Sequence, residues 1–96
     1  MRIYKESLPL FDDDILIKSH AKTKEEFKNT ILKIDVQNTT GPVIWYFFDD
    51  DCDESNLMEF GIYAVGTGWR IDPSTIDNYI GTADYYGYVY HYFIDG

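Results

Sequence analysis

The sequence predicts a mainly β protein, a small antiparallel sandwich or partly open barrel of about six strands with at most one short helix. Short apolar segments alternate with turns rich in Gly, Asp and Pro. Tyr and Phe, which favour sheets, occur 9 and 6 times. Only one stretch carries helix signals. A chain of 96 residues with 45% hydrophobic side chains suffices for a single domain, residues 1–96, with a modest core.

The chain opens with two predicted strands. Residues 2–11 alternate loosely between apolar and polar side chains, but Pro9 interrupts them, which is typical of an edge strand. Three aspartates at 12–14 form the following turn, and residues 15–20 form a short second strand.

Residues 22–30 are the only helix-compatible stretch. Thr23 followed by Glu26 matches a capping box, in which each side chain satisfies a free backbone N–H group. A helix this short is unstable alone, so we expect it to dock through Phe27 and Ile31.

Residues 31–48 predict a β-hairpin. Residues 31–37 alternate with period two, which indicates one buried face. A polar turn at 38–41 follows, and the continuous apolar run 42–48 indicates a central strand covered on both sides. The face expected to be buried in the first strand consists of Leu32, Ile34 and Val36.

The second half predicts a further strand and a closing hairpin. The loop 49–56 is strongly acidic, so we expect it to be solvated. Residues 57–66 form a strand, 67–78 a long connection, and 79–86 with 88–94 the closing hairpin.

Charge is distributed unevenly along the chain, and the formal net charge is −9. Seven of the eight cations lie within residues 1–33, and Arg70 is the only one that follows. The basic footprint of a duplex-DNA-binding protein is therefore missing, and we expect no direct DNA binding. The negative field favours solubility or a basic partner.

Several features that the sequence lacks limit where the protein is expected to reside and which catalytic or metal sites it can form. The single cysteine, Cys52, permits no disulfide within the chain, and no leader or apolar span is recognisable, so we expect a cytoplasmic protein without membrane contact. His20 and His91 are too few and too isolated to suggest a triad or a zinc site, and loop 49–56 lacks the glycine and final glutamate of a calcium loop. We expect no enzyme, no metal and no cofactor.

The candidate ligand site begins where the strand 57–66 ends. Gly66 and Gly68 allow close backbone approach to a ligand, and Trp69 offers a stacking surface. The guanidinium group of Arg70 can form two hydrogen bonds to a phosphate. Gly81-Thr82 repeats the Gly-Thr pair on the neighbouring hairpin. The predicted ligand-binding residues are Gly66, Thr67, Gly68, Trp69, Arg70, Gly81, Thr82 and His91. The alternative is a purely structural turn in which Trp69 covers the end of the sandwich and Arg70 pairs with Asp72.

The order of several short motifs resembles a family. They are Leu8-Pro9-Leu10, Val36-Gln37-Asn38, Trp45, Gly66-Thr67-Gly68, Tyr79-Ile80-Gly81-Thr82 and Val89-Tyr90-His91-Tyr92-Phe93. In this order they resemble a family of small uncharacterised proteins of tailed bacteriophages and prophages, defined as a domain of unknown function. The segment 21–30 is longer than in that family, and loop 49–54 is more acidic. The resemblance implies a phage origin and a fold, and it implies no reaction.

Two functions of different classes follow from these expectations. In the first, the protein is a counter-defence sponge that sequesters a small nucleotide-type immune signal, works as a homo-oligomer, and uses the face of Tyr88, Tyr90 and Tyr92 as its subunit interface. In the second, it is an acidic nucleic-acid mimic that inhibits a basic host defence protein through Asp12–Asp14 and Asp49–Glu54. The identity of the ligand or host target and the number of subunits lie beyond the sequence.

Overall fold

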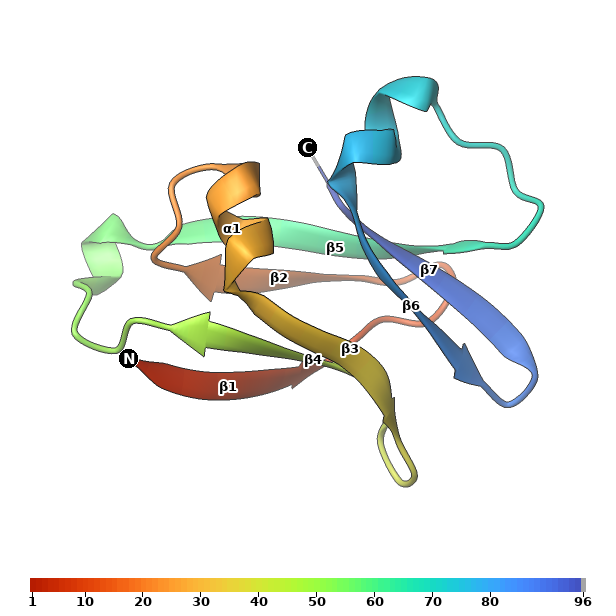
Figure 1. Cartoon of the computed structure of the whole chain (residues 1–96), viewed down its shortest axis with the longest axis horizontal. Coiled ribbons are helices and arrows are strands. Elements are labelled where there is room, and N and C mark those ends of the chain that lie inside the picture. Colours follow the sequence, from red (N-terminus) through yellow and green to blue (C-terminus); the bar gives the residue numbers. More distant parts are fainter. Residues whose placement is uncertain (96) are drawn as a thin grey trace.

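A computed structural model describes residues 1–95 as seven strands in two antiparallel sheets, with one α-helix (Figure 1). The three-stranded sheet has the order β1 (Arg2–Ser7), β4 (Gly41–Phe48), β3 (Ile31–Gln37). The four-stranded sheet has the order β2 (Asp14–Ser19), β5 (Met58–Gly66), β7 (Tyr88–Ile94), β6 (Tyr79–Tyr85). The helix α1 spans Lys24–Thr30, and two 3-10 helices span Glu54–Asn56 and Pro73–Asn78. The predicted mainly β fold, a small antiparallel sandwich or partly open barrel, is confirmed, and the structure has seven strands where about six were expected.

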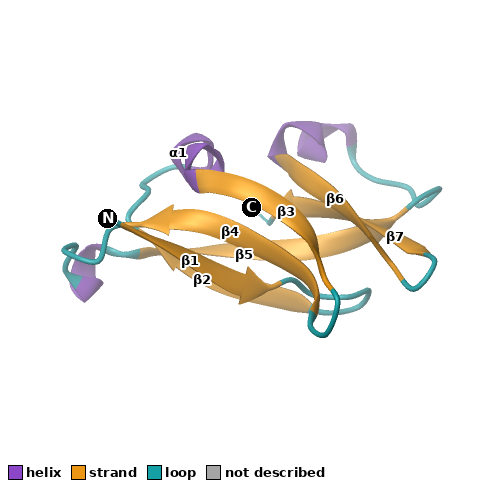
Figure 2. Cartoon of the chain, turned by 60° about the horizontal axis from the view of Figure 1, so that its bottom comes forward, coloured by secondary structure: helices purple, strands orange, loops and turns teal. Residues whose placement is uncertain are grey.

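The two sheets form two layers around one core (Figures 1 and 2). Ile44 and Tyr46 from β4 meet Ile62, Tyr92 and Ile94 from β5 and β7, and all five are buried. Each strand contributes alternate residues because successive side chains point to opposite faces. β1 pairs with β4 alone and is an edge strand, as Pro9 indicates. Within residues 1–95 no helix has the length and apolar character needed to cross a membrane.

The helix begins at the predicted cap. The Thr23 hydroxyl accepts a hydrogen bond from the Glu26 N–H at 3.1 Å, and the Glu26 carboxylate accepts one from the Lys22 N–H at 2.7 Å. Phe27 is fully buried, and its ring stacks on Phe60 with centroids 4.5 Å apart. Docking through this one ring stabilises a seven-residue helix that is too short to persist alone.

The predicted burial of Leu32 is wrong, because the register of β3 against β4 shifts between Ile31 and Lys33. The bulge inserts one residue into β3 and turns Leu32 outward, where it is 47% exposed. Ile34 and Val36 pack against the core as expected.

The predicted subunit interface on β7 is also wrong. Tyr90 and Tyr92 lie in the core, and only Tyr88, beyond the end of the core, is exposed. The Tyr92 hydroxyl donates a hydrogen bond to the Pro9 carbonyl at 2.9 Å, so the phenol is satisfied inside the protein. A row of tyrosines at period two therefore marks the inner face of the sheet here.

The turn between β6 and β7 places a tyrosine in a strained conformation. Tyr86 has φ 50° and Gly87 has φ 81°, which is the type I′ geometry of a two-residue hairpin. Asn and Gly adopt positive φ readily, whereas a bulky side chain does so at a cost of about 1–2 kcal/mol.

We expect Tyr86→Asn to raise the free energy of unfolding by roughly 1 kcal/mol, because asparagine tolerates the left-handed conformation. Thermal and urea unfolding measure the change. Gly87→Ala is the matched control and should lower stability, because it introduces strain at the neighbouring position. An unchanged midpoint in Tyr86→Asn would show that this turn stores no strain.

We expect the protein to unfold in alkali between pH 10 and 12. Burial raises the pKa of Tyr46 from 10.0 to about 12, with a contribution from nearby Glu6, and burial also raises the pKa of Tyr92. A raised folded-state pKa means that the stability is fully present below pH 10 and is lost as pH rises through 12. Circular dichroism against pH measures this loss. Tyr46→Phe should shift it to higher pH, and Tyr88→Phe, which removes an exposed phenol, should not.

Candidate ligand-binding groove

The Gly66–Trp69 turn folds the indole back over the end of β5. The backbone N–H of Trp69 donates a hydrogen bond to the Gly66 carbonyl at 3.2 Å. Gly68 has φ 88°, a backbone conformation that favours glycine. A Cβ atom on Gly66 would lie 2.8 Å from two indole atoms of Trp69, Cε2 and Nε1. Glycine is therefore required at both positions, because Gly68 adopts the positive φ of the turn and Gly66 leaves room for the indole.

Phe11 completes an aromatic cluster at this end of the sandwich. Its ring lies 4.8 Å from that of Trp69, 4.3 Å from that of Tyr90 and 6.1 Å from that of Tyr88. Phe11 sits in the Leu10–Asp13 turn, where Asp12 has φ 70°. The sequence does not predict this contribution, since a single Phe before three aspartates carries no sign that it meets residues 69 and 88.

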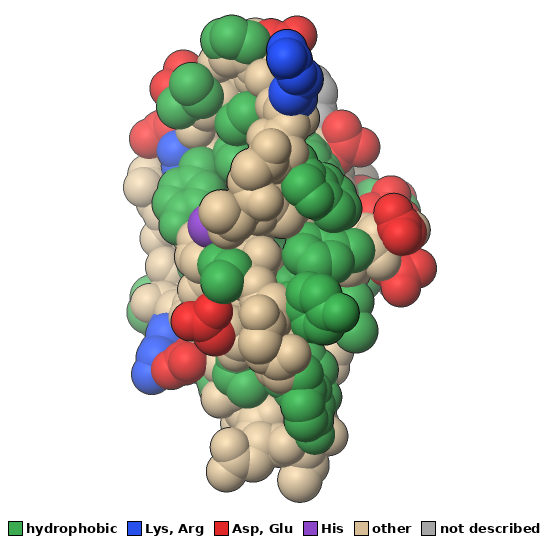
Figure 3. Space-filling view, turned by 90° about the vertical axis from the view of Figure 1, so that its right-hand side faces the viewer, with side chains coloured by type: hydrophobic (Ala, Val, Ile, Leu, Met, Phe, Trp, Pro, Cys, Tyr) green, Lys and Arg blue, Asp and Glu red, His purple; other side chains and the backbone are tan. Residues whose placement is uncertain are grey.

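The rings border an open groove of about 430 Å³, which we call the aromatic groove. Trp69 is 51% exposed and Tyr88 is 61% exposed, so both offer ring surface to solvent. Figure 3 shows this end of the molecule, with hydrophobic side chains in a band down its length. The volume lies within the usual range for small-molecule sites. The lining residues are Phe11, Gly66, Thr67, Trp69, Gly87, Tyr88 and Val89.

Thr67 also starts a chain of hydrogen bonds across the outer face of the four-stranded sheet. Its hydroxyl lies 2.8 Å from His91 Nε2, and the Thr82 hydroxyl lies 3.0 Å from His91 Nδ1. The Tyr79 hydroxyl continues the chain to Thr82 at 2.5 Å. Each hydroxyl can donate or accept, so the chain holds His91 in place in either tautomer.

The structure thus brings some predicted site residues together and separates others. Thr67 and Thr82 meet through His91, whereas Gly81 faces the interior, where a Cβ atom would lie 2.7 Å from Ile34 Cδ1. Gly81 allows β6 to approach β3 and does not belong to the groove.

Arg70 follows Trp69 at the surface but does not line the groove. Within residues 1–95 its guanidinium has no ion pair, so the alternative pairing with Asp72 is not formed. Asp72 instead caps the 3-10 helix Pro73–Asn78 by accepting from the Ser74 N–H at 2.9 Å, and this bond lowers the pKa of Asp72.

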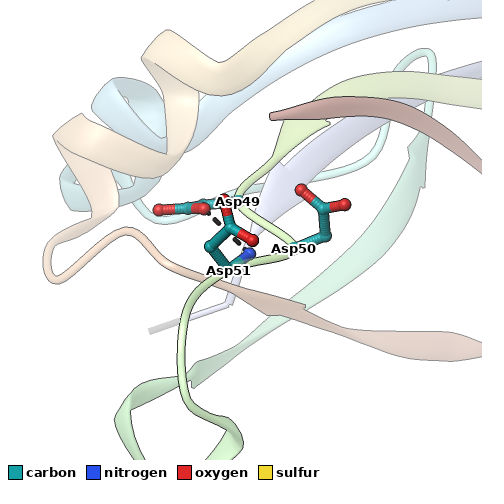
Figure 4. Close-up of side chains that lie close together, drawn as sticks. All are labelled: Asp49, Asp50 and Asp51. Carbon is teal, nitrogen blue, oxygen red and sulfur yellow. Dashed lines mark hydrogen bonds between the residues drawn. The ribbon is translucent and has the colours of Figure 1, made fainter.

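The two acidic runs lie at opposite ends of the molecule. Asp12 and Asp13 lie in the β1–β2 connection directly after Phe11, and Asp14 begins β2. Residues 49–54 follow β4 at the other end of the molecule (Figure 1). One carboxylate oxygen from each of Asp49, Asp50 and Asp51 lies within 4.8 Å of the others (Figure 4). Asp50 is engaged by Arg2 Nε at 2.6 Å, which lowers the pKa of this carboxyl group, and the Asp49 N–H donates to His20 Nδ1.

A second, smaller cleft of about 220 Å³ lies between α1, β3 and β6. Two of its lining residues are cations, but Lys28 donates to the Asp77 carbonyl at 2.7 Å and Lys33 pairs with Asp35 at 3.0 Å. Neither lysine lines the aromatic groove.

We expect Gly66→Ala to displace the Trp69 indole from Phe11, because the new methyl group would lie 2.8 Å from it. Overpacking of this kind lowers stability by about 1–3 kcal/mol. In a Trp45→Phe background, the emission of Trp69 should shift to longer wavelength. Gly68→Ala is the control: its methyl group would meet nothing within 4 Å, so stability should fall with a smaller change in emission.

Comparison with known proteins gives one match, which covers nearly the whole chain. The family model described as "Domain of unknown function (DUF7352)" matches residues 1–95. No curated protein and no solved structure matches the chain. The match carries no activity or ligand, and the phage origin implied by the resemblance above stays a prediction. The chain belongs to the DUF7352 family.

Proposed function

We propose that the protein is a non-enzymatic binding protein whose aromatic groove holds the flat ring of a small nucleotide-type ligand. One observation carries the proposal. Three aromatic rings from distant segments, Phe11, Trp69 and Tyr88, border one open groove with bare glycine backbone between them. Stacking of a base on an aromatic side chain contributes on the order of 1–3 kcal/mol.

The surroundings of the groove supply polar contacts for the rest of such a ligand. Thr67 lines the groove, and its hydroxyl is hydrogen-bonded to His91. Arg70 follows Trp69 directly, is exposed, and has no ion pair within residues 1–95. Its guanidinium group is therefore free to bind a phosphate through two hydrogen bonds. The acidic turn beside Phe11 opposes a highly charged ligand, which favours one with few phosphates.

A binding role fits the surroundings of His91 better than catalysis. Its Nε2 atom lies 2.8 Å from the Thr67 hydroxyl, a distance compatible with a base and a nucleophile. The other ring nitrogen meets the neutral Thr82 hydroxyl, whereas hydrolase triads place a carboxylate there to stabilise the imidazolium. His91 therefore holds the hydroxyl groups of Thr67 and Thr82 in place through two hydrogen bonds.

Sequestration of a host immune signal in the cytoplasm remains the biological role we propose for this binding, on the resemblance to phage proteins. The competing role, acidic mimicry of nucleic acid, receives less support. Its two acidic runs lie at opposite ends, and Asp50 and Glu54 are paired with Arg2 and Lys18. A phosphate-like surface needs contiguous unpaired charge.

Calorimetric titration with adenosine monophosphate and a cyclic dinucleotide tests the proposal. We expect binding of at least one probe, and a loss of about tenfold or more in Trp69→Ala because the stacking surface is removed. Trp45→Phe is the matched control, since Trp45 lies on β4, outside the residues that line the groove.

Two outcomes would contradict the proposal. In one, neither probe binds, and polylysine binds with an affinity that falls steeply as salt rises, which supports acidic mimicry. In the other, nucleotides bind with equal affinity to Trp69→Ala and the unmodified protein, which would show that the nucleotide site lies outside the aromatic groove.

A further inference from the structure

The edge strand β1 is unpartnered along one side. Among residues 1–95 it pairs only with β4, and all six of its residues are exposed. It contains neither proline nor a bulge, and its register with β4 is regular from Arg2 to Ser7. Edge strands are commonly protected against further pairing by proline, by bulges or by charged side chains, and β1 has only the charged side chains, so its backbone remains a template for another strand.

The hydrogen-bond pattern between β1 and β4 determines which backbone groups of β1 point away from the sheet. The Leu8 N–H donates to the Pro42 carbonyl at 2.9 Å, which makes Leu8 a residue whose backbone groups face β4. Because these groups alternate along an antiparallel strand, those of Tyr4 and Glu6 also face β4. The N–H and C=O groups of Ile3, Lys5 and Ser7 point away from the sheet, and no strand of the described residues pairs with them.

This free edge is complementary to itself. In an antiparallel pair of two β1 strands centred on Tyr4, Arg2 of one copy lies opposite Glu6 of the other, twice by symmetry. The same register places Ile3 opposite Lys5, the two residues whose free backbone groups then pair. We propose that two copies of this chain associate through β1, which joins their three-stranded sheets into one continuous sheet.

Side chains along the edge add to the backbone pairing. Tyr4, which already stacks on Phe48 at 5.0 Å, would meet its counterpart at the two-fold axis. Ile3 is 58% exposed beside Phe47 and would lie against the stem of Lys5 from the second copy. The segment 2–7 carries two cations and one anion, and Asp50 pairs with Arg2 beside it, so the local charge is close to balanced and two copies meet less repulsion here than elsewhere on an acidic surface.

The other sheet also ends in a free edge, at β2. Its inner face is already buried through Ile17 and Ser19, and Lys18 is engaged by Glu54 at 2.9 Å. Arg2 on β1 is likewise engaged, by Asp50 at 2.6 Å, so existing ion pairs do not distinguish the two edges, and β2 serves as the reference edge for the experiment.

Charge reversal tests the proposal in sedimentation velocity over a concentration series. The unmodified chain should form a dimer of the 11.2 kDa protomer. Arg2→Glu alone and Glu6→Arg alone each place like charges opposite one another, and we expect dimerisation to weaken roughly tenfold or more. An equimolar mixture of the two variants pairs Glu with Arg at both positions and should restore the dimer.

Two further variants separate the interface from folding. Lys5→Pro removes an outward N–H group and leaves the bonds to β4, so the variant should keep its circular dichroism spectrum and lose the dimer. Leu16→Glu on β2 should dimerise normally. A monomeric unmodified chain, a mixture that stays monomeric while each variant is folded, or a dimer lost only in Leu16→Glu would each overturn the proposal.

Discussion

The hydrogen bond from the Tyr92 hydroxyl to the Pro9 carbonyl is the constraint on which the arrangement of the aromatic groove depends. Tyr92 is fully buried in β7, and Pro9 lies two residues before Phe11 in the β1–β2 connection. The bond therefore fixes the connection between the sheets against the core of the four-stranded sheet. A buried phenol without this acceptor would be destabilising by about 1–3 kcal/mol. With it, Phe11 reaches Tyr90 and Trp69, and the aromatic groove acquires its floor.

The same end of the sandwich combines a fixed glycine turn with exposed aromatic surface. Gly66 and Gly68 determine where the indole can lie, and Thr67 links the groove to His91 on the outer face of the sheet. Aromatic surface exposed to this extent in a small acidic domain carries a solvation cost, which a stacked ligand would relieve. Net charge acts in the opposite direction, since Asp12–Asp14 directly follow the groove residue Phe11 and Arg70 is the only cation that follows Lys33. The balance favours a flat ligand of low charge.

The groove and the β1 edge occupy different parts of the fold, so separate variants can test the proposed ligand binding and the proposed self-association. β1 belongs to the three-stranded sheet, whereas Trp69, Tyr88 and Thr67 follow or belong to strands of the four-stranded sheet. Phe11 is the one groove residue in the connection that leaves β1.

The sequence by itself determined the features that depend on neighbouring residues. These are the two-sheet β class, the cap at Thr23, the hairpins 31–48 and 79–94, and the glycine turn after β5. Periodicity separates two faces of a strand but does not say which one is inside, so the tyrosines of β7 were assigned to the wrong side and the bulge at Leu32 was missed. Only the tertiary structure decided that Phe11 meets Trp69, that Gly81 accommodates Ile34, and that His91 joins two threonines. Those contacts join residues far apart in sequence, and packing between the sheets sets them, which no local pattern encodes.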